Sequence, residues 1–268
     1  MQSNPLRTLL DKPAVALRCR ALLLVLLIAA CVGCQAEKPK MLLYCGAGIR
    51  PAAAELADEF EKQHGMLVEC DYAGSEVLLG RIKLSGRGDL YMPGDVFYVD
   101  QADEQKLIAG RKTACYFVPV ILVQKDNPKN IQTLADLTEP GIELGLGNPE
   151  ACAIGRKAKK IFAKNNIAME DLKDNLKFES ATVNELGNHI KLGKLDAVIV
   201  WDAVADYFAD ESTVVPIPVE KNVISTVVVG RLTCSEHPEL AEKFLEFIGS
   251  EEGQAIFEKH HFTVKAPE

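Results

Sequence analysis

The strongest constraint on the fold is an order of segments that repeats from residue 41 onward: a short apolar run, a turn, and a helical pattern. The first round reads MLLYC (41–45), GAGIRP, and a helix over 52–63. The apolar positions of that helix recur at helical spacing: Ala53, Leu56, Ala57 and Phe60. A second apolar run (66–72), a second helix and the segment GDLYMPGD (88–95) follow. A β-α-β-α-β order predicts a parallel sheet with helices on its faces.

The second helix begins at Gly74 and Ser75, directly after a strand, as the first one does after GAGIRP. We expect four of its apolar residues to face the core: Val77, Leu78, Ile82 and Leu84. A glycine-lined turn that opens a helix lets an anion approach backbone N–H groups, although a plain tight turn explains the glycines equally well.

The rest of the chain predicts a second lobe. The run YFVPVILVQ (116–124) is long enough to leave one domain and enter another. The next segment, IELGLGNPEACAIGRKAKKIF, reads as a strand, a turn and a helix. It is followed by a helix over 183–192 and by a strand over 195–201 that is expected to be buried on both faces. The strand ISTVVVG (224–230) leads back to two short helices that divide near Gly249. This order predicts two α/β lobes, 40–117 with 223–268 and 118–222, joined by two crossover strands. Ligands bind at the carboxyl ends of such strands, so the cleft between the lobes is the expected site.

The first thirty residues have the features of an export signal. Four basic residues precede ALLLVLLIAA (21–30), an apolar run about half as long as a membrane span. The small residues before Cys31 are typical of a bacterial lipobox, with Cys34 as a second candidate for lipidation. We therefore expect a signal peptide at 1–30, a linker at 31–39, and a protein held by lipid on a bacterial membrane, in the periplasm or at the cell surface.

Net charge limits the partners. The chain carries −8, and residues 1–30 carry four basic groups and one Asp, so the mature protein carries about −11 (−8 minus +3). Such an acidic chain disfavours nucleic acid and anionic lipid headgroups as partners. Its cysteines lack zinc-type spacing, and Cys45 with Cys70 could be either a disulfide or two free thiols. A bound anion would have to be held by local dipoles.

The placed segments resemble the molybdate-type periplasmic binding proteins of bacteria. The resemblance runs through LLYCGAGIRPAAAELADEFEKQHG, DYAGSEVLLGRI, GDLYMPGD, GNPEACAIG and LDAVIVWDAVA to FLEFIGSEEGQAIFEKHHF. It implies the two-lobed "Venus flytrap" fold and a monomeric receptor without cofactor or enzymatic activity. It also implies delivery of a small oxyanion, such as molybdate or tungstate, to the inner-membrane permease of an ABC importer.

The resemblance implies a set of ligand-binding residues, most of which stand where a strand gives way to a helix. Backbone N–H groups at helix starts carry partial positive charge and can hold an oxyanion without a counterion. The implied contacts are Ala47, Gly48, Gly74 and Ser75 in lobe 1, and Ala153, Ile154, Val183 or Asn184, and Trp201 in lobe 2.

Two departures from the family leave the ligand open. The family commonly has a serine at the position of Gly48 and a tyrosine near that of Trp201, so two hydroxyls are missing. Arg50 could point into the cleft and clamp an organic phosphate or carboxylate, or it could be a solvated arginine of the first helical turn. Trp201 could line the wall of the cleft or pack in the core.

Other functions have less support in the sequence. Asp95 and Asp202 are expected as hinge or helix-capping groups, the pair His260-His261 as surface residues, and no site for a bare metal cation is predicted. The chain has no catalytic triad order, HExxH motif or paired acids, and Cys152, the candidate for a thiol enzyme, has no obvious base. An anchored adhesin or sensor domain with the same fold remains an alternative to transport.

Overall fold

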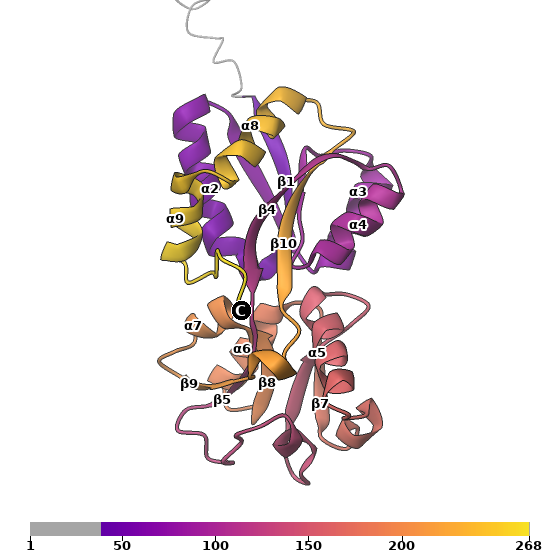
Figure 1. The fold of residues 1–268 in the computed structure, drawn as a ribbon, viewed down its shortest axis with the longest axis vertical. Coiled ribbons are helices and arrows are strands. Elements are labelled where there is room, and N and C mark those ends of the chain that lie inside the picture. The colour runs from indigo at the N-terminus through magenta and orange to yellow at the C-terminus, as the bar shows by residue number, and fades with distance from the viewer. Residues whose placement is uncertain (1–38, 268) are drawn as a thin grey trace, which may run out of the picture. The chain divides into compact units, whose positions relative to one another are not determined.

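Two five-stranded sheets organise the chain, one above the other in Figure 1. The structure is a computed structural model that describes residues 39–267. The predicted signal peptide, Cys31, Cys34 and almost all of the predicted linker lie outside the described residues. We call the two halves lobe 1 and lobe 2.

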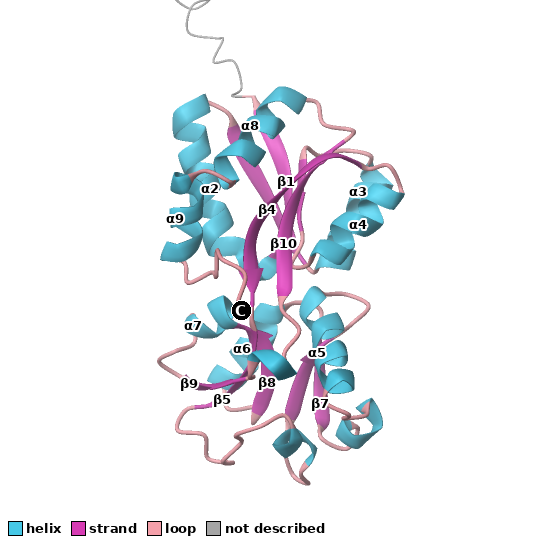
Figure 2. Ribbon diagram, in the orientation of Figure 1, coloured by secondary structure: helices cyan, strands magenta, loops and turns pink. Residues whose placement is uncertain are grey.

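Lobe 1 is built on a sheet in which one strand opposes the other four. In sheet order its strands are β2 (Leu67–Ala73), β1 (Lys40–Gly46), β3 (Leu90–Met92), β10 (Ser225–Leu232) and β4 (Ile108–Phe117). β1 is parallel to β2 and β3, whereas β10 is antiparallel to both of its neighbours. Helices flank this sheet on two sides: α2 (Arg50–His64), α8 (Pro238–Ile248) and α9 (Glu251–Lys259) on one, α3 (Ser75–Ser85) and α4 (Val96–Glu104) on the other (Figures 1 and 2).

Lobe 2 repeats the arrangement. In sheet order its strands are β7 (Leu176–Ser180), β6 (Leu144–Gly147), β8 (Ala197–Trp201), β5 (Pro119–Gln124) and β9 (Ser212–Pro216), and only β5 opposes the others. Its helices are α5 (Ala153–Lys164), α6 (Val183–Lys191) and the short α7 (Asp202–Asp206). Short 3-10 turns stand at Ala135–Thr138, Met169–Leu172 and Val219–Lys221, and one more, Ala47–Ile49, follows β1 in lobe 1.

The chain crosses between the lobes twice. β4 continues through Val118 into β5, and β9 returns through residues 217–224 into β10. The two crossings are tied together by Asn222, whose side-chain amide donates to the carbonyl oxygens of Pro119 (2.8 Å) and Ile217 (3.3 Å). The antiparallel strand of each sheet, β10 in lobe 1 and β5 in lobe 2, is the strand that carries the chain away from the crossing.

The α/β fold with mostly parallel sheets is confirmed, and so is the burial of β8 along its whole length. The buried face predicted for α3 is partly wrong, because Val77 is 38% exposed and Leu84 is 90% exposed. The helix buries Ser75, Leu78, Leu79 and Ile82, which are spaced three, four and seven residues apart. Val77 and Leu84, seven residues apart, share the opposite face, so the prediction had mixed two faces.

Candidate functional site

A small buried cavity lies between the lobes, where strands of both sheets end. Lobe 1 contributes Gly46, Ala47, Gly48, Ile49, Ala73, Gly74, Ser75, Gly94 and Phe117. Lobe 2 contributes Cys152, Ala153, Ile154, Thr182, Val183 and Trp201. The cavity offers about 20 Å³ to the centre of a water-sized sphere. Such a space corresponds to roughly one or two waters, so the enclosed part of the cavity is small with the lobes in this position.

Eight of the ten residues predicted from the sequence line this cavity: Ala47, Gly48, Gly74, Ser75, Ala153, Ile154, Val183 and Trp201. Asn184 and Arg50 are not among the lining residues. The Arg50 guanidinium lies 4.4 Å from the ring centroid of Tyr72, in a cation–π contact on an exposed side chain. That placement differs from the cleft-facing orientation considered for Arg50. Whether any of the ten binds a ligand remains a prediction.

The cavity also contains residues that the sequence did not single out, of which Thr182 and Phe117 are the most informative. Thr182 directly precedes α6, and threonine is a preferred residue before a helix, which is a signal that was available. Phe117 ends β4 at the crossover and was visible only as part of a long apolar run.

The helices that begin at the cavity lack side-chain caps. No side chain accepts a hydrogen bond from the first turn of α3, α5 or α6, whose cap positions are Gly74, Cys152 and Thr182. Two other helices are capped, α4 by Asp95, which follows the lining residue Gly94, and α9 by Ser250, whereas α8 has no side-chain cap either. The N–H groups of a first helical turn need an acceptor from outside the helix. At the cavity, the Glu76 N–H of α3 already donates to the Ala151 carbonyl oxygen, and a ligand can supply the acceptor for the remaining N–H groups.

Ser75 is oriented by two contacts within lobe 1. Its hydroxyl oxygen accepts a hydrogen bond from the Gly94 N–H (3.1 Å), and its carbonyl oxygen accepts one from the Tyr91 hydroxyl (2.7 Å). The side chain is 3% exposed and lines the cavity. Since the oxygen is already an acceptor, the hydroxyl proton is left to donate into the cavity.

The lobes are in direct contact around the cavity. The Glu76 N–H donates to the Ala151 carbonyl oxygen across the cleft (3.2 Å). A Cβ placed on Gly74 would lie 2.4 Å from that same oxygen and 2.6 Å from the Ala181 carbonyl oxygen. A Cβ on Gly48 would lie 2.9 Å from Val183 Cγ1, so the serine common in the family would require the Val183 side chain or lobe 2 to shift. The glycines allow the lobes to approach this closely.

A buried ion pair bridges the lobes beside the hinge. Lys157 Nζ of α5 lies 2.8 Å from Asp95 Oδ2, and it also donates to the Ile224 carbonyl oxygen (3.0 Å). Asp95 Oδ1 accepts from the Phe97 N–H (3.2 Å) and Oδ2 accepts from the Ser225 hydroxyl (2.5 Å). The expected capping role of Asp95 is confirmed, and its carboxylate also links the two lobes.

The second expected hinge residue, Asp202, holds the crossover backbone. Its Oδ1 accepts from the Val118 N–H (3.1 Å) and its Oδ2 accepts from the Thr263 hydroxyl (3.2 Å). Burial raises the pKa of this carboxyl group above its ordinary value, with the hydrogen bonds acting in the opposite direction. Asp202 therefore contacts the crossover, and its role as a hinge group stays a prediction.

The cysteines of the described residues, including Cys152 at the cavity, are free thiols. Burial raises the pKa of Cys152 to about 11, and its Sγ donates to the carbonyl oxygens of Asn148 and Ser180 (3.6 Å each). A neutral, donating thiol is a poor nucleophile. Cys45 and Cys70 lie on adjacent strands as expected, but they do not form a disulfide.

The lining of the cavity contains no charged side chain. The C-terminal histidines lie elsewhere, His260 beside Glu55 (2.8 Å) and His261 beside Asp206 (3.1 Å). Within residues 39–267, no group of three or more metal-binding side chains comes together. No helix in the same range is long and apolar enough to cross a membrane. Backbone dipoles and hydroxyls thus dominate the electrostatics of the cavity.

The chain is similar to known solute-binding proteins. Residues 41–263 match the family model of bacterial extracellular solute-binding proteins. A protein of Haemophilus influenzae named as a binding protein is 28% identical over 83% of this chain and 90% of its own. The molybdate-binding protein ModA of Mycobacterium bovis is 23% identical over 89% and 94%. The periplasmic molybdate-binding protein of Azotobacter vinelandii has a similar fold (TM-score 0.71, 15% identity, 84% of this chain and 100% of that one). Family members bind solutes and are not enzymes. The chain belongs to the bacterial extracellular solute-binding proteins.

Proposed function

We propose that this substrate-binding protein of an ABC importer takes a small, fully ionised inorganic oxyanion, molybdate or tungstate, into the cavity between its lobes. The observation that carries the proposal is the meeting of three uncapped helix starts in a buried cavity without charged side chains. N–H groups at helix starts hold anions, and each charge-assisted hydrogen bond contributes about 1.5–3 kcal/mol.

The lining favours an anion that only accepts hydrogen bonds. Its backbone N–H groups and the Ser75 hydroxyl are donors, the Thr182 hydroxyl can donate or accept, and no carboxylate is present to accept a proton from the ligand. A monoprotonated anion such as hydrogen phosphate would bury an O–H group facing donors, which costs free energy. A tetrahedral dianion without protons avoids that cost. The molybdate named in two of the similar proteins has this character.

The small cavity also argues against the alternative ligand, an organic phosphate or carboxylate held by Arg50. That alternative needs room for an organic group and a guanidinium aimed at it. The cavity offers about 20 Å³, and the Arg50 guanidinium is placed over Tyr72 instead. The inorganic anion is therefore the better supported ligand.

Calorimetric titration with molybdate, tungstate, sulfate and phosphate at pH 7 tests the proposal. We expect molybdate and tungstate to bind, and phosphate to bind at least tenfold more weakly. Ser75→Ala should weaken molybdate binding by about 1.5–3 kcal/mol, the range for one charge-assisted hydrogen bond. The matched control is Ser250→Ala, which removes the cap of α9 and should lower stability but leave affinity unchanged. No binding of any oxyanion would overturn the proposal.

We further propose that lipid on Cys31 anchors the protein, as a monomer, where it can deliver its ligand to a membrane permease. Cys31→Ser should then move the protein from the membrane fraction to the soluble fraction. Retention at the membrane would point to Cys34 or exclude the anchor. Loss of molybdate uptake in a deletion strain would support transport, whereas normal uptake would favour the adhesin or sensor alternative.

A further inference from the structure

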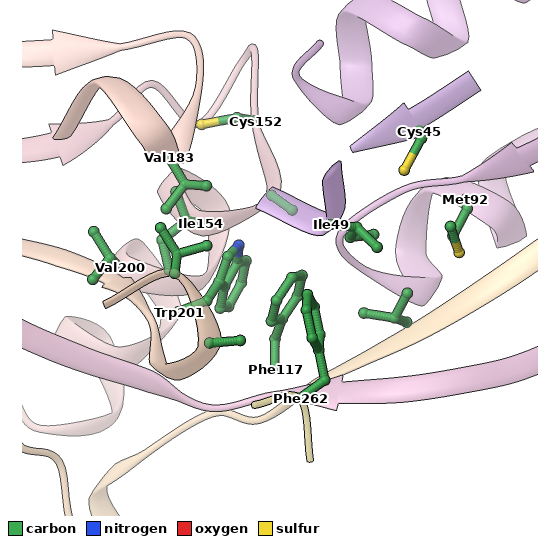
Figure 3. Packing of buried hydrophobic residues seen from close by; sticks show 14 of the residues in the cluster. Cys45, Ile49, Met92, Phe117, Cys152, Ile154, Val183, Val200, Trp201 and Phe262 are labelled. Carbon is green, nitrogen blue, oxygen red and sulfur yellow. The ribbon is translucent and has the colours of Figure 1, made fainter. Parts of the chain in front are cut away.

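Trp201, the only tryptophan in the chain, forms one wall of the cavity. It is the last residue of β8 and is 2% exposed. Its ring stacks on Phe117, with centroids 4.7 Å apart and planes 6° apart, and Phe262 packs behind Phe117 at 5.2 Å. Figure 3 shows these three rings side by side, with Ile154 and Val183 on the other side of the indole. The stack fixes the position and tilt of the indole.

The indole N–H has no acceptor within the described part of the chain. No hydrogen bond from Trp201 Nε1 is formed there, although buried indole N–H groups ordinarily find a partner. Nε1 is not fully enclosed, and because Trp201 is only 2% exposed and lines the cavity, we assign the accessible area of Nε1 to the cavity. The donor is therefore buried, free and beside the space that a ligand would fill.

The orientation of the ring agrees with this assignment. Trp201 Cδ1, the atom bonded to Nε1, lies 3.3 Å from the point that a Cβ on Gly48 would occupy. Gly48 also lines the cavity, so the pyrrole edge of the indole faces the ligand space and not the core. In Figure 3 the indole nitrogen is on the edge of the ring nearest Ile154 and Val183, two further lining residues.

We propose that the indole N–H of Trp201 donates a hydrogen bond to the bound oxyanion, and that it is a determinant of specificity. This inference rests on the proposed function. A hydroxyl group can rotate and either donate or accept, whereas an indole N–H can only donate. Because the stack on Phe117 holds the ring in place, this donor is pre-organised and cannot adapt to a protonated ligand oxygen. Trp201 thereby strengthens the preference for an anion that carries no proton.

Deleting only the N–H group gives the sharpest test. Since the chain has one tryptophan, growth of a tryptophan auxotroph on benzothienylalanine replaces the N–H of Trp201 with sulfur and keeps the shape of the ring. Calorimetry with molybdate should show a loss of affinity of between about tenfold and 150-fold, the range for one charge-assisted hydrogen bond. Trp201→Phe should lose at least as much. In the benzothienylalanine protein and in Trp201→Phe, the ratio of the affinity for molybdate to the affinity for phosphate should be smaller than in wild type.

A spectroscopic readout separates the hydrogen bond from packing. The single indole gives one ¹⁵N–¹H signal, and saturating molybdate should move its proton downfield and slow its exchange with water. If wild type binds molybdate and the benzothienyl protein binds within twofold of it, Trp201 is not a ligand and only this inference falls. The same conclusion follows if Trp201→Phe alone loses affinity, because packing then explains the loss. If wild type binds no oxyanion, the proposed function fails as well.

Discussion

Replacing Gly74 with alanine should hold the lobes apart without disturbing either one. Gly74 has φ −66° and ψ 149°, a conformation open to any residue, so alanine adds no backbone strain. Its Cβ, however, would lie 2.4 Å from the Ala151 carbonyl oxygen and 2.6 Å from the Ala181 carbonyl oxygen. Both oxygens belong to lobe 2. Relieving the overlap to an ordinary contact requires the lobes to separate by about 1 Å, because backbone atoms on rigid elements do not yield as flexible side chains do.

That separation determines the expected magnitude. A shift of about 1 Å would break the 3.2 Å hydrogen bond from the Glu76 N–H to Ala151 and lengthen the ligand's bonds to one lobe. Losing two charge-assisted hydrogen bonds of about 1.5 kcal/mol each would weaken molybdate binding by about 3 kcal/mol, or roughly a hundredfold. Stability without ligand should change little, because the overlap lies between the lobes and not within one.

Calorimetry with molybdate and urea unfolding would measure both effects. The matched control is Gly80→Ala in the same helix, where an added Cβ meets nothing within 4 Å. We expect it to raise stability by about 0.5–1 kcal/mol and to leave affinity unchanged. Wild-type affinity in Gly74→Ala would refute the reasoning, since it would mean that the ligand-bound lobes do not approach as closely as in this structure.

Three further substitutions test other parts of the molecule. Arg50→Gln should leave molybdate affinity within about threefold, because the guanidinium lies over Tyr72; a hundredfold loss in the same titration would make Arg50 a ligand. Lys157→Met should cost about 3–5 kcal/mol in urea unfolding by leaving Asp95 buried without its cation, and adding Asp95→Asn should recover part of that cost. If the double variant is no better than the single one, the pair is not coupled. The raised pKa of Asp202 means that its charged form opposes folding at neutral pH, and this cost disappears as pH falls through the folded-state pKa. When the pH is lowered from 7 to 4, the effect of Asp202 should raise the unfolding free energy of wild type relative to that of Asp202→Asn. Equal shifts of the two urea midpoints between these pH values would contradict this.

The sequence by itself determined the architecture, because strand, turn and helix patterns depend on neighbouring residues. The alternation from MLLYC onward indicated the α/β layers, and the long run over 116–124 indicated where the chain leaves lobe 1. Gly74-Ser75 and the start of α5 at Ala153 were also visible, since a strand that ends in a helix start is a local signal. Polar segments gave weaker signals: the first half of β4, whose residues are largely exposed, was not predicted.

Only the tertiary structure decided how these pieces meet. It turned the Arg50 guanidinium onto Tyr72 and stacked the Trp201 ring on Phe117 at the cavity, two orientations that no periodic pattern encodes. It also brought Gly74 against Ala151 and Ala181, residues about eighty and more than a hundred positions away along the chain. Contacts of this kind depend on how two separately folded lobes are set by their crossover strands. Periodicity reports which face of an element is buried, but not which distant element covers it.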